Sequence, residues 1–424
     1  MKKVVKKVAL LLIVFGIGVG VTLLYTNNKY KVYEEEEPKQ IKKRVDTISM
    51  MLETEAKSGN YELTTASSWP TEGYVFNSEL SVCEHGSELS WDDENKRVVM
   101  SGNVSDKCYV YFDVYVPPTI ADFCNSGDTL TTCVKNFGNQ GTDMSNIYIH
   151  NSGLTNGAGD NSYRYAGANP NNFVCFGTNT TPCPTDNLYR IIGVFGDQVK
   201  LIKYDYATSA LLGSDGDYYG KYTYGSSTYK GSNYANIASY YWNNSTRKNT
   251  WSESNLNKVN LNTNFITNIG SEWANKIALT TWKVGGNTYS NIASKTPSVA
   301  YQNEITNAVT TNTTDGATEY TAKIGLMYVS DYGFAAEPSA WTSTMGNYNN
   351  RISTNWMYMG LWEWTNSRSA DGSKSAFYVP DNGQVNDDSG YVSYGYGCRP
   401  SFSLLPSTTY VSGDGTQNSP IIIN

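Results

Sequence analysis

The hydrophobic pattern of the chain begins with an apolar run near the amino-terminal end. Residues 8–25 read VALLLIVFGIGVGVTLLY, and no charged residue occurs among the 21 positions from Val8 to Asn28. As an α-helix, a run of this length spans the roughly 30 Å hydrocarbon core of a bilayer. The pattern therefore predicts a transmembrane anchor within residues 1–30.

The residues around this run predict its orientation. Four lysines precede it between Lys2 and Lys7, and the positive-inside rule retains such a cluster in the cytoplasm. A cleaved signal peptide is the alternative, but the following sequence LLYTNNKYK has no small-x-small cleavage site. We expect an uncleaved, single-pass anchor in the cell membrane with the body of the protein extracellular. Gly16 and Gly20 form a GxxxG motif, which indicates either a homodimer contact between two anchors or a chance spacing.

Residues 31–116 contain short segments in which apolar and polar positions alternate, as they do in β-strands. Segments 47–54 and 61–65 predict a strand pair, although helical spacing from Ile41 to Leu52 leaves a stalk helix as the alternative. Further strands are predicted at 74–76, 88–91, 97–100 and 109–115. This part is therefore expected to be a stalk and a small all-β domain, which ends at the Pro117–Pro118 linker.

Residues 117–424 mix both periodicities and are expected to form one larger α+β unit. Residues 189–204, YRIIGVFGDQVKLIKY, predict a β-hairpin, and 251–265 predict a helix with an apolar stripe. A further helical turn is expected at 271–277. Additional strands are predicted at 322–329, 356–362, 375–379 and 397–405. The fold class is therefore α+β and β-rich.

The charge distribution limits the partners of this chain. Residues 1–44 contain ten Lys/Arg and four Glu, so the other residues carry a net 22 − 35 = −13. An acidic body repels phosphate backbones, which argues against binding to nucleic acid. The chain has only two histidines, His85 and His150, which argues against metallohydrolases and triad hydrolases.

The cysteines support an extracellular location. Six of the seven form local couples, each closing a short loop, and an exported chain favours disulfides at such positions. Other pairings and buried free thiols are the alternatives. Cys398 is left over and is expected to be a small core residue. The predicted disulfides are Cys83–Cys108, Cys124–Cys133 and Cys175–Cys183.

Two groups of acidic residues are candidates for chemistry. Asp331 and Glu363 each adjoin aromatic residues and could flank a glycosidic bond, although carboxylates that hold loops are commoner. A polar loop offers hard oxygen ligands for calcium, although such loops are usually plain turns. The candidate calcium ligands are Asp381, Asn382, Asp387 and Asp388. No other metal or cofactor is predicted.

A tyrosine-rich segment near the carboxyl end is the strongest candidate for binding. Residues 377–396, FYVPDNGQVNDDSGYVSYGY, combine rigid amphipathic rings with small polar groups, as antibody paratopes do. A surface hairpin that shields its own strands is the alternative. Phe377, Val379 and Phe402 are expected to face inward. The predicted exposed ligand-binding patch comprises Tyr378, Asn382, Gln384, Asn386, Asp388, Tyr391, Tyr394 and Tyr396.

Ordered Trp and apolar positions also carry a resemblance. TWSESNLNKVNLNTNF, YVSDYGF and the segment from LWEWTNSRS to GYGCRPSFSL resemble the C-type-lectin-like fold of formylglycine-generating enzymes and of variable retroelement proteins. The resemblance covers residues 185–424. It implies a ligand face near Gly397–Pro400, whereas the oxidase members use two cysteines and this region has only Cys398.

The small domain carries a second resemblance. SVCEHGSELSWDDENKRVV, followed by a cysteine and YVYFD, resembles membrane-anchored surface proteins of gut Firmicutes, which are Gram-positive. Together these features predict a cell-surface display and binding protein, adhesin-like, with an extracellular glycan or protein ligand. An extracellular envelope enzyme such as a glycoside hydrolase, or a purely structural envelope component, is the alternative.

The topology can be tested on cells. Protease added to intact, wall-stripped cells should degrade the body of the protein, because the lysine cluster before Val8 directs everything after the anchor outward. A cytoplasmic marker protein in the same cells should stay intact. Protection of the body until the cells are lysed would contradict the predicted topology.

Overall fold

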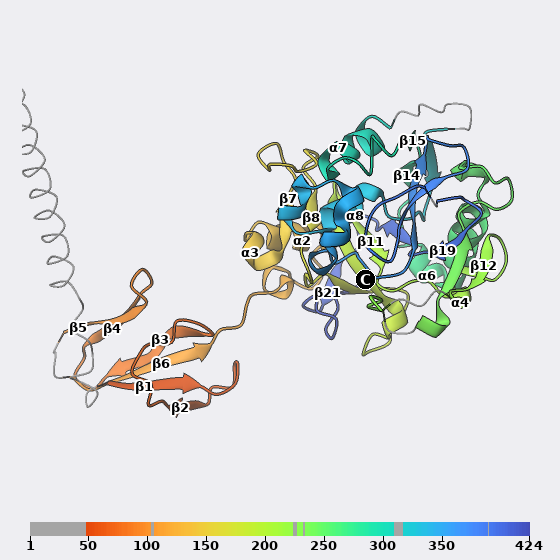
Figure 1. Cartoon of the computed structure of the whole chain (residues 1–424). Coiled ribbons are helices and arrows are strands. Elements are labelled where there is room, and N and C mark those ends of the chain that lie inside the picture. Colours follow the sequence, from red (N-terminus) through yellow and green to blue (C-terminus); the bar gives the residue numbers. More distant parts are fainter. Residues whose placement is uncertain (1–47, 103–105, 224–226, 232–233, 309–316, 389) are drawn as a thin grey trace, which may run out of the picture. The chain divides into compact units, whose positions relative to one another are not determined.

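The computed structural model describes residues 48–102, 106–223, 227–231, 234–308, 317–388 and 390–424. The predicted anchor and its GxxxG motif lie outside these residues. Within the described ranges, no helix combines the length and the apolar character needed to cross a membrane. The chain divides into two compact units between Pro117 and Pro118 (Figure 1).

The described residues of the first unit form six β-strands. Four of them form a sheet in the order β2-β1-β6-β3, in which β1 runs parallel to β6. The other two form a separate hairpin, β4-β5. The strand pair that begins at residue 48 confirms the strand interpretation for these residues over the helical one. The strands are β1 (Ile48–Glu53), β2 (Tyr61–Leu63), β3 (Tyr74–Cys83), β4 (Glu88–Asp92), β5 (Arg97–Ser101) and β6 (Cys108–Val114).

Phe112 of β6 is the centre of the core of this small unit. Its ring centroid lies 5.9 Å from those of Trp69 and Phe76 and 5.7 Å from that of Trp91. A domain of this size buries little apolar surface, so a covalent link adds a large share of its stability. The predicted Cys83–Cys108 disulfide is present and joins β3 to β6.

The second unit contains two six-stranded sheets. The first has the order β20-β11-β10-β8-β7, with β9 paired to β10, and the second has the order β12-β13-β19-β17-β15, with β18 paired to β17. The first sheet comprises β7 (Ile147–Ile149), β8 (Tyr163–Tyr165), β9 (Phe173–Cys175), β10 (Leu188–Phe195), β11 (Gln198–Lys203) and β20 (Ser401–Ser403). The second comprises β12 (Tyr218–Lys221), β13 (Ala238–Tyr241), β15 (Gly286–Asn287), β17 (Glu363–Ser369), β18 (Ala376–Val379) and β19 (Gly395–Gly397).

Two strand pairs and several short helices complete this unit. The pairs are β14 (Thr280–Lys283) with β16 (Glu319–Ala322), and β21 (Tyr410–Ser412) with β22 (Ile422–Ile423). The α-helices are α2 (Leu130–Gly138), α3 (Thr142–Ser145), α4 (Ser209–Leu212), α5 (Ile266–Asn268), α6 (Ser271–Ala274), α7 (Pro297–Tyr301) and α8 (Val329–Ala335). Wider π-helical turns occur at Leu256–Phe265 and Gln302–Thr306. Short 3₁₀ turns occur at Ile120–Phe123, Thr185–Asn187, Tyr234–Asn236, Trp251–Glu253, Pro338–Thr342, Met345–Asn350 and Ile352–Thr354.

The α+β, β-rich class is confirmed, and so is the hairpin predicted at 189–204. It is formed by β10 and β11, whose turn includes Gly196 at a φ of +65°, a left-handed conformation that glycine adopts without strain. Almost all of β10 is buried, as expected of a continuous Val/Ile/Leu run covered on both faces. The predicted helix at 251–265 is also helical, although its main part has π-helical geometry.

Two predicted strands are wrong. Residues 322–329 lie between the end of β16 and the start of α8, and residues 356–362 precede β17. Trp356–Leu361 is nonetheless buried throughout. Periodicity cannot separate a buried irregular segment from a buried strand, because both appear as short apolar runs.

The remaining cysteine predictions are confirmed. Cys124 is bonded to Cys133 and Cys175 to Cys183, while Cys398 is a buried free thiol. Burial raises the pKa of the Cys398 thiol well above its ordinary value, which keeps it protonated and unreactive.

His150 lies inside the second unit and is completely buried. Its Nδ1 accepts a hydrogen bond from the backbone N–H of Ala158 at 3.0 Å, and its ring packs against Phe334 and Trp341. Burial, reinforced by the positive charge of Arg164, lowers its pKa to about 2. The folded protein therefore contains a neutral imidazole at this position throughout the physiological range.

This burial predicts a pH-dependent stability. The pKa of His150 is about 2 in the folded protein and about 6.5 in the unfolded chain, so between these pH values only the unfolded chain binds a proton at His150. The contribution of the buried neutral His150 to the free energy of unfolding is therefore complete above pH 6.5 and is lost as the pH falls. His150→Asn keeps the Nδ1-type acceptor and removes the titration. We expect the unfolding free energy of wild type minus that of the variant to fall by up to about 1.4 kcal/mol per pH unit below pH 6, measured by urea denaturation.

The comparison with the variant is needed because other groups titrate in the opposite sense. Burial raises the pKa of Glu304 to about 7 and that of Asp387 to about 6, so both carboxyls stabilise the folded state as the pH falls through this range. They are common to both proteins and cancel in the difference. A difference that stays constant from pH 7 to pH 5 would contradict the buried neutral histidine.

Candidate functional site

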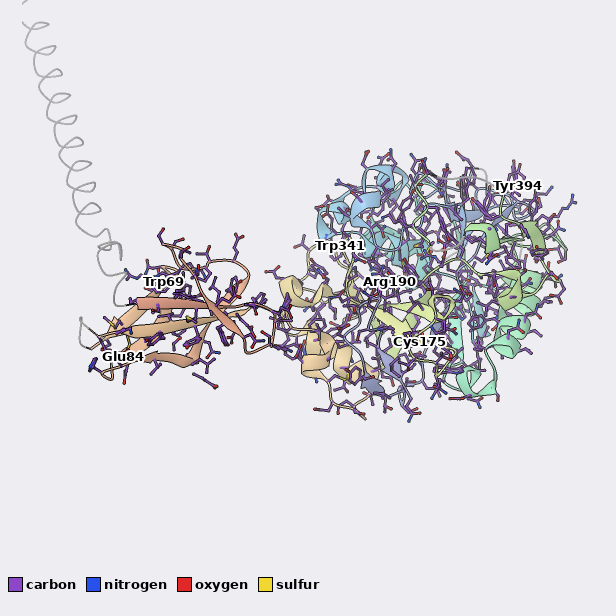
Figure 2. All side chains as sticks on the ribbon, turned by 90° about the horizontal axis from the view of Figure 1, so that it is seen from below. Trp69, Glu84, Cys175, Arg190, Trp341 and Tyr394 are labelled. Carbon is purple, nitrogen blue, oxygen red and sulfur yellow. A yellow bond between two sulfur atoms is a disulfide. The ribbon has the colours of Figure 1, made fainter. Side chains whose placement is uncertain are left out.

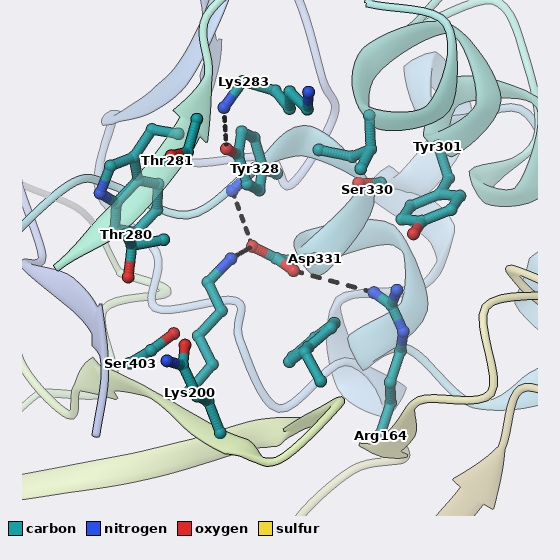
Figure 3. A pocket seen from close by; sticks show the side chains of 14 residues that line it. Arg164, Lys200, Thr280, Thr281, Lys283, Tyr301, Tyr328, Ser330, Asp331 and Ser403 are labelled. Atoms are coloured by element: carbon teal, nitrogen blue, oxygen red, sulfur yellow. Dashed lines mark hydrogen bonds and ion pairs between the residues drawn. The ribbon is translucent and has the colours of Figure 1, made fainter. Parts of the chain in front are cut away.

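The second unit contains a pocket of about 220 Å³ (Figure 3). Its walls come from elements that are distant in sequence, because β8, β11 and β14 meet there with the first turn of α8. Phe195, Trp282, Tyr301 and Tyr328 supply aromatic surface, and hydroxyl and charged groups supply the polar part. The polar lining residues are Arg164, Gln198, Lys200, Thr280, Thr281, Lys283, Ser330, Asp331 and Ser403.

Asp331 is the centre of the charged network in this pocket. Its Oδ2 atom accepts a hydrogen bond from Lys200 Nζ at 2.5 Å and another from the backbone N–H of Tyr328 at 2.9 Å (Figure 3). Its Oδ1 atom lies 3.8 Å from the guanidinium of Arg164. All three charged side chains are more than nine-tenths buried. The carboxyl is therefore fully engaged by cations and by the backbone.

The surroundings of Lys200 are largely aromatic. Its Nζ lies 4.5 Å from the ring centroid of Tyr328, 5.4 Å from that of Trp282 and 5.6 Å from that of Phe195. Burial lowers the pKa of Lys200, and the nearby charge of Asp331 opposes this shift. Such ring faces attract a cation but replace only part of its hydration.

Glu304 is a second buried carboxyl beside the first turn of α8. Its two oxygens accept hydrogen bonds from the backbone N–H groups of Val329, at 3.0 Å, and Ser330, at 2.9 Å, and the Ser367 hydroxyl also donates to it. Burial raises its pKa to about 7. Asp331 accepts a hydrogen bond from the backbone N–H of Tyr328. The carboxyls of Glu304 and Asp331 therefore accept from three successive backbone N–H groups, those of residues 328 to 330.

The candidate glycosidase carboxyls are both held in ion pairs. Asp331 is bound as described, and Glu363 of β17 accepts from Arg399 in a two-pronged pair at 2.7 and 2.9 Å. Glu363 is 2% exposed and does not line the pocket. The geometry does not present these two carboxyls as a free acid and base on either side of a substrate.

The predicted tyrosine patch is divided between the surface and the interior. Tyr391 and Tyr394 are exposed, at 46% and 45%, and so are Asn382 and Asp388. Gln384 and Asn386 are half-buried. Figure 2 shows Tyr394 at the periphery of the second unit.

Tyr378 and Tyr396 are buried, so their predicted exposure is wrong. The Tyr378 ring stacks on Trp362 at 5.2 Å, and the Tyr396 ring lies 4.4 Å from that of Trp364. Both tyrosines lie on strands of the second sheet, β18 and β19, and pack in its covered face. Composition indicates rings suited to a surface but not which of them the sheet covers. The predicted inward positions Phe377, Val379 and Phe402 are buried.

The polar residues of the segment are also spread along the sheet. Asn382 follows the carboxyl end of β18, whereas Tyr391 pairs with Ser375, immediately before its amino end. Four strand residues at about 3.3 Å each separate these two ends. The eight predicted residues therefore do not form a single exposed patch.

A strand that belongs to the same sheet carries a further exposed tyrosine. Tyr219 of β12 is 48% exposed, and its ring covers Gly395, the residue after Tyr394. It also meets Tyr241 of β13 edge-on at 5.1 Å. Tyr391 and Tyr394 meet in the same edge-on manner at 5.4 Å. We call Tyr219, Tyr241, Tyr391 and Tyr394 the tyrosine surface.

Sequence reasoning missed Tyr219 and Tyr241 because the pairing β12-β13-β19 joins segments about 150 residues apart. The available signal was Gly395 in the Tyr-Gly-Tyr-Gly run, since a glycine between aromatic residues of a strand often accommodates a ring from a neighbouring strand. Nothing in the sequence identified which ring that is.

The candidate calcium ligands are not gathered into one cluster. Asp387 is buried and accepts a hydrogen bond from Ser369, whereas Asp388 is exposed. Among the residues described by the structure, Cys124, Asp128 and Cys133 form the one group of His, Cys, Asp and Glu ligand atoms close enough to share a metal ion. Its two sulfurs form a disulfide and are not thiolate ligands. Calcium binding stays a prediction.

Comparison with known proteins adds no assignment. No family model, no curated protein and no solved structure matches this chain. The function of the two candidate sites is therefore argued from their own geometry.

The Arg399–Glu363 pair provides a test of whether Glu363 is structural. Glu363→Gln should lower the free energy of unfolding by roughly 3–5 kcal/mol, because it leaves Arg399 buried without a counter-charge. Urea denaturation measures this loss. The matched control, Glu319→Gln, removes a surface partner of Lys283 and should cost no more than about 1 kcal/mol. An unchanged stability of the Glu363 variant would indicate a carboxyl that is free for chemistry.

Proposed function

We propose that this protein is displayed on the outside of the cell and binds an extracellular glycan or protein through the tyrosine surface of its second unit. The observation that carries the proposal is the exposure of three large rings near β12 and β19 of one sheet, those of Tyr219 on β12 and of Tyr391 and Tyr394 before β19, the last two in edge-on contact. An exposed group of large rings on a soluble unit is typical of an interaction site.

The physical properties of these rings suit recognition. A tyrosine offers a wide apolar face and one hydroxyl, and only two side-chain torsions are restricted when it binds. The rings rest on a rigid support, since Gly395 lies beneath Tyr219 and the buried Tyr396 neighbours Tyr394. The tyrosine side chains therefore lose little conformational entropy when a ligand stacks on them.

Three observations support the extracellular location. The structure contains three disulfides, which persist mainly in oxidising compartments. The sequence supplies an apolar run of membrane-spanning length after a lysine cluster. The chain beyond residue 44 is acidic, which keeps an exposed body soluble. The anchor, the surface display and the adhesin-like role belong to this proposal.

The lectin-like architecture of the second unit is part of the same proposal. The resemblance implies a ligand face near Gly397–Pro400, and the tyrosine surface adjoins this segment because Gly395 belongs to the same strand, β19. Catalysis is less well supported, because Asp331 and Glu363 are both held in buried ion pairs. A purely structural envelope component would not explain exposed rings.

The test removes the exposed rings of Tyr391 and Tyr394. Tyr391→Ala with Tyr394→Ala should reduce binding of the ectodomain at least tenfold on a glycan and host-protein array, because both rings supply contact area. The melting temperature should change little, since both side chains are nearly half exposed.

Two controls make the outcome interpretable. Tyr115→Ala removes an equally exposed ring from the first unit and should leave binding intact. Phe402→Ala removes a wholly buried ring and should destabilise the second unit by roughly 3–5 kcal/mol. A double Tyr variant that stays folded and binds as wild type does would overturn the tyrosine surface as the site.

A further inference from the structure

We propose that Lys200 and Asp331 become joined by an intramolecular amide bond, formed between their side chains after the second unit has folded. The two residues are 131 positions apart in the chain and come from β11 and α8. Folding places the Lys200 Nζ atom 2.5 Å from Asp331 Oδ2, so the amine is in contact with the carboxyl group (Figure 3). This inference is independent of the proposed ligand-binding function.

The enclosure of the pair favours condensation. Lys200 is 7% exposed and Asp331 3%, and the rings of Tyr328, Trp282 and Phe195 surround the amine. Two ions removed from water carry a large desolvation cost, whereas a neutral amide does not. Holding both groups at contact distance also replaces a bimolecular encounter by a step within one molecule, which raises its rate by many orders of magnitude.

The step balances without any added reagent. The ion pair first passes a proton from the ammonium of Lys200 to the carboxylate of Asp331, which gives a free amine and a carboxylic acid. The nitrogen lone pair then attacks Cγ of Asp331, a C–N bond forms, and one C–O bond breaks. One hydrogen from nitrogen and the hydroxyl group leave together as water. The products are an amide and one water molecule, and nothing is oxidised or reduced.

A neighbouring group matches the needs of this step. Arg164, 3.8 Å from Oδ1, is placed to stabilise negative charge that develops on that oxygen during the attack. The leaving oxygen is then Oδ2, which faces Lys200.

The bond would connect the first sheet to the first turn of α8, across a loop of 131 residues. A cross-link over so long a loop strongly restricts the unfolded chain. Such a constraint would suit a protein that is exposed to proteases and mechanical load, as the proposed surface location implies, although its formation does not depend on that location.

The mass of the wild-type protein decides the proposal. The full chain, purified, reduced and denatured, should be lighter than its sequence mass by one water molecule, and protease digestion should give one branched peptide containing Lys200 and Asp331. Lys200→Arg and Asp331→Ala should both show the full sequence mass of the substituted chain. An intact mass equal to the sequence mass in folded wild-type protein would overturn the bond and leave an ion pair only.

Discussion

The buried pair between Arg399 and Glu363 is the interaction on which the second unit depends most. Arg399 follows β19 and precedes β20, so it lies where the chain passes from one six-stranded sheet to the other. Its guanidinium holds both oxygens of Glu363, the first residue of β17, and also donates to the carbonyl of Met357 at 2.7 Å. One side chain thereby ties together both sheets and the irregular buried segment before β17.

A buried ion pair is not in itself a strong source of stability, because the desolvation of two charges offsets much of their attraction. Its effect here is on specificity. A planar guanidinium with three directed bonds accepts one arrangement of its partners, whereas the apolar residues around it tolerate several. The parallel pairing of Glu363 with Gly397 follows from the same geometry, since Arg399 stands two residues further along. Tyr396 of β19 packs against Trp364 of β17 in the interior, whereas Tyr394, which precedes β19, is exposed.

The sequence was informative wherever the determining contacts are local. The β10–β11 hairpin, the β1–β2 and β4–β5 strand pairs and all three disulfides join residues close in the chain, and each was predicted. Prediction failed where contacts are distant. Whether Tyr378 and Tyr396 are buried depends on the aromatic residues of β17. The Lys200–Asp331 pair joins β11 to α8, and periodicity at either position shows only that a polar residue occurs in an apolar run. The candidate pocket could not be predicted for that reason, although Asp331 itself was singled out.

The two candidate sites differ in a way that bears on what each can do. In the pocket, every charge at the centre already has a partner from within the chain, since Asp331 holds Lys200 and approaches Arg164, which also pairs with Asp160 at 2.7 Å. A charged ligand entering the pocket would have to displace one of these internal ions. The pocket therefore favours a reaction between the protein's own side chains over a reaction with a bound ligand. At the tyrosine surface the rings face solvent, and contact with a ligand removes apolar area from water without breaking any internal bond. The arrangement therefore favours internal chemistry in the pocket and recognition of partners at the surface.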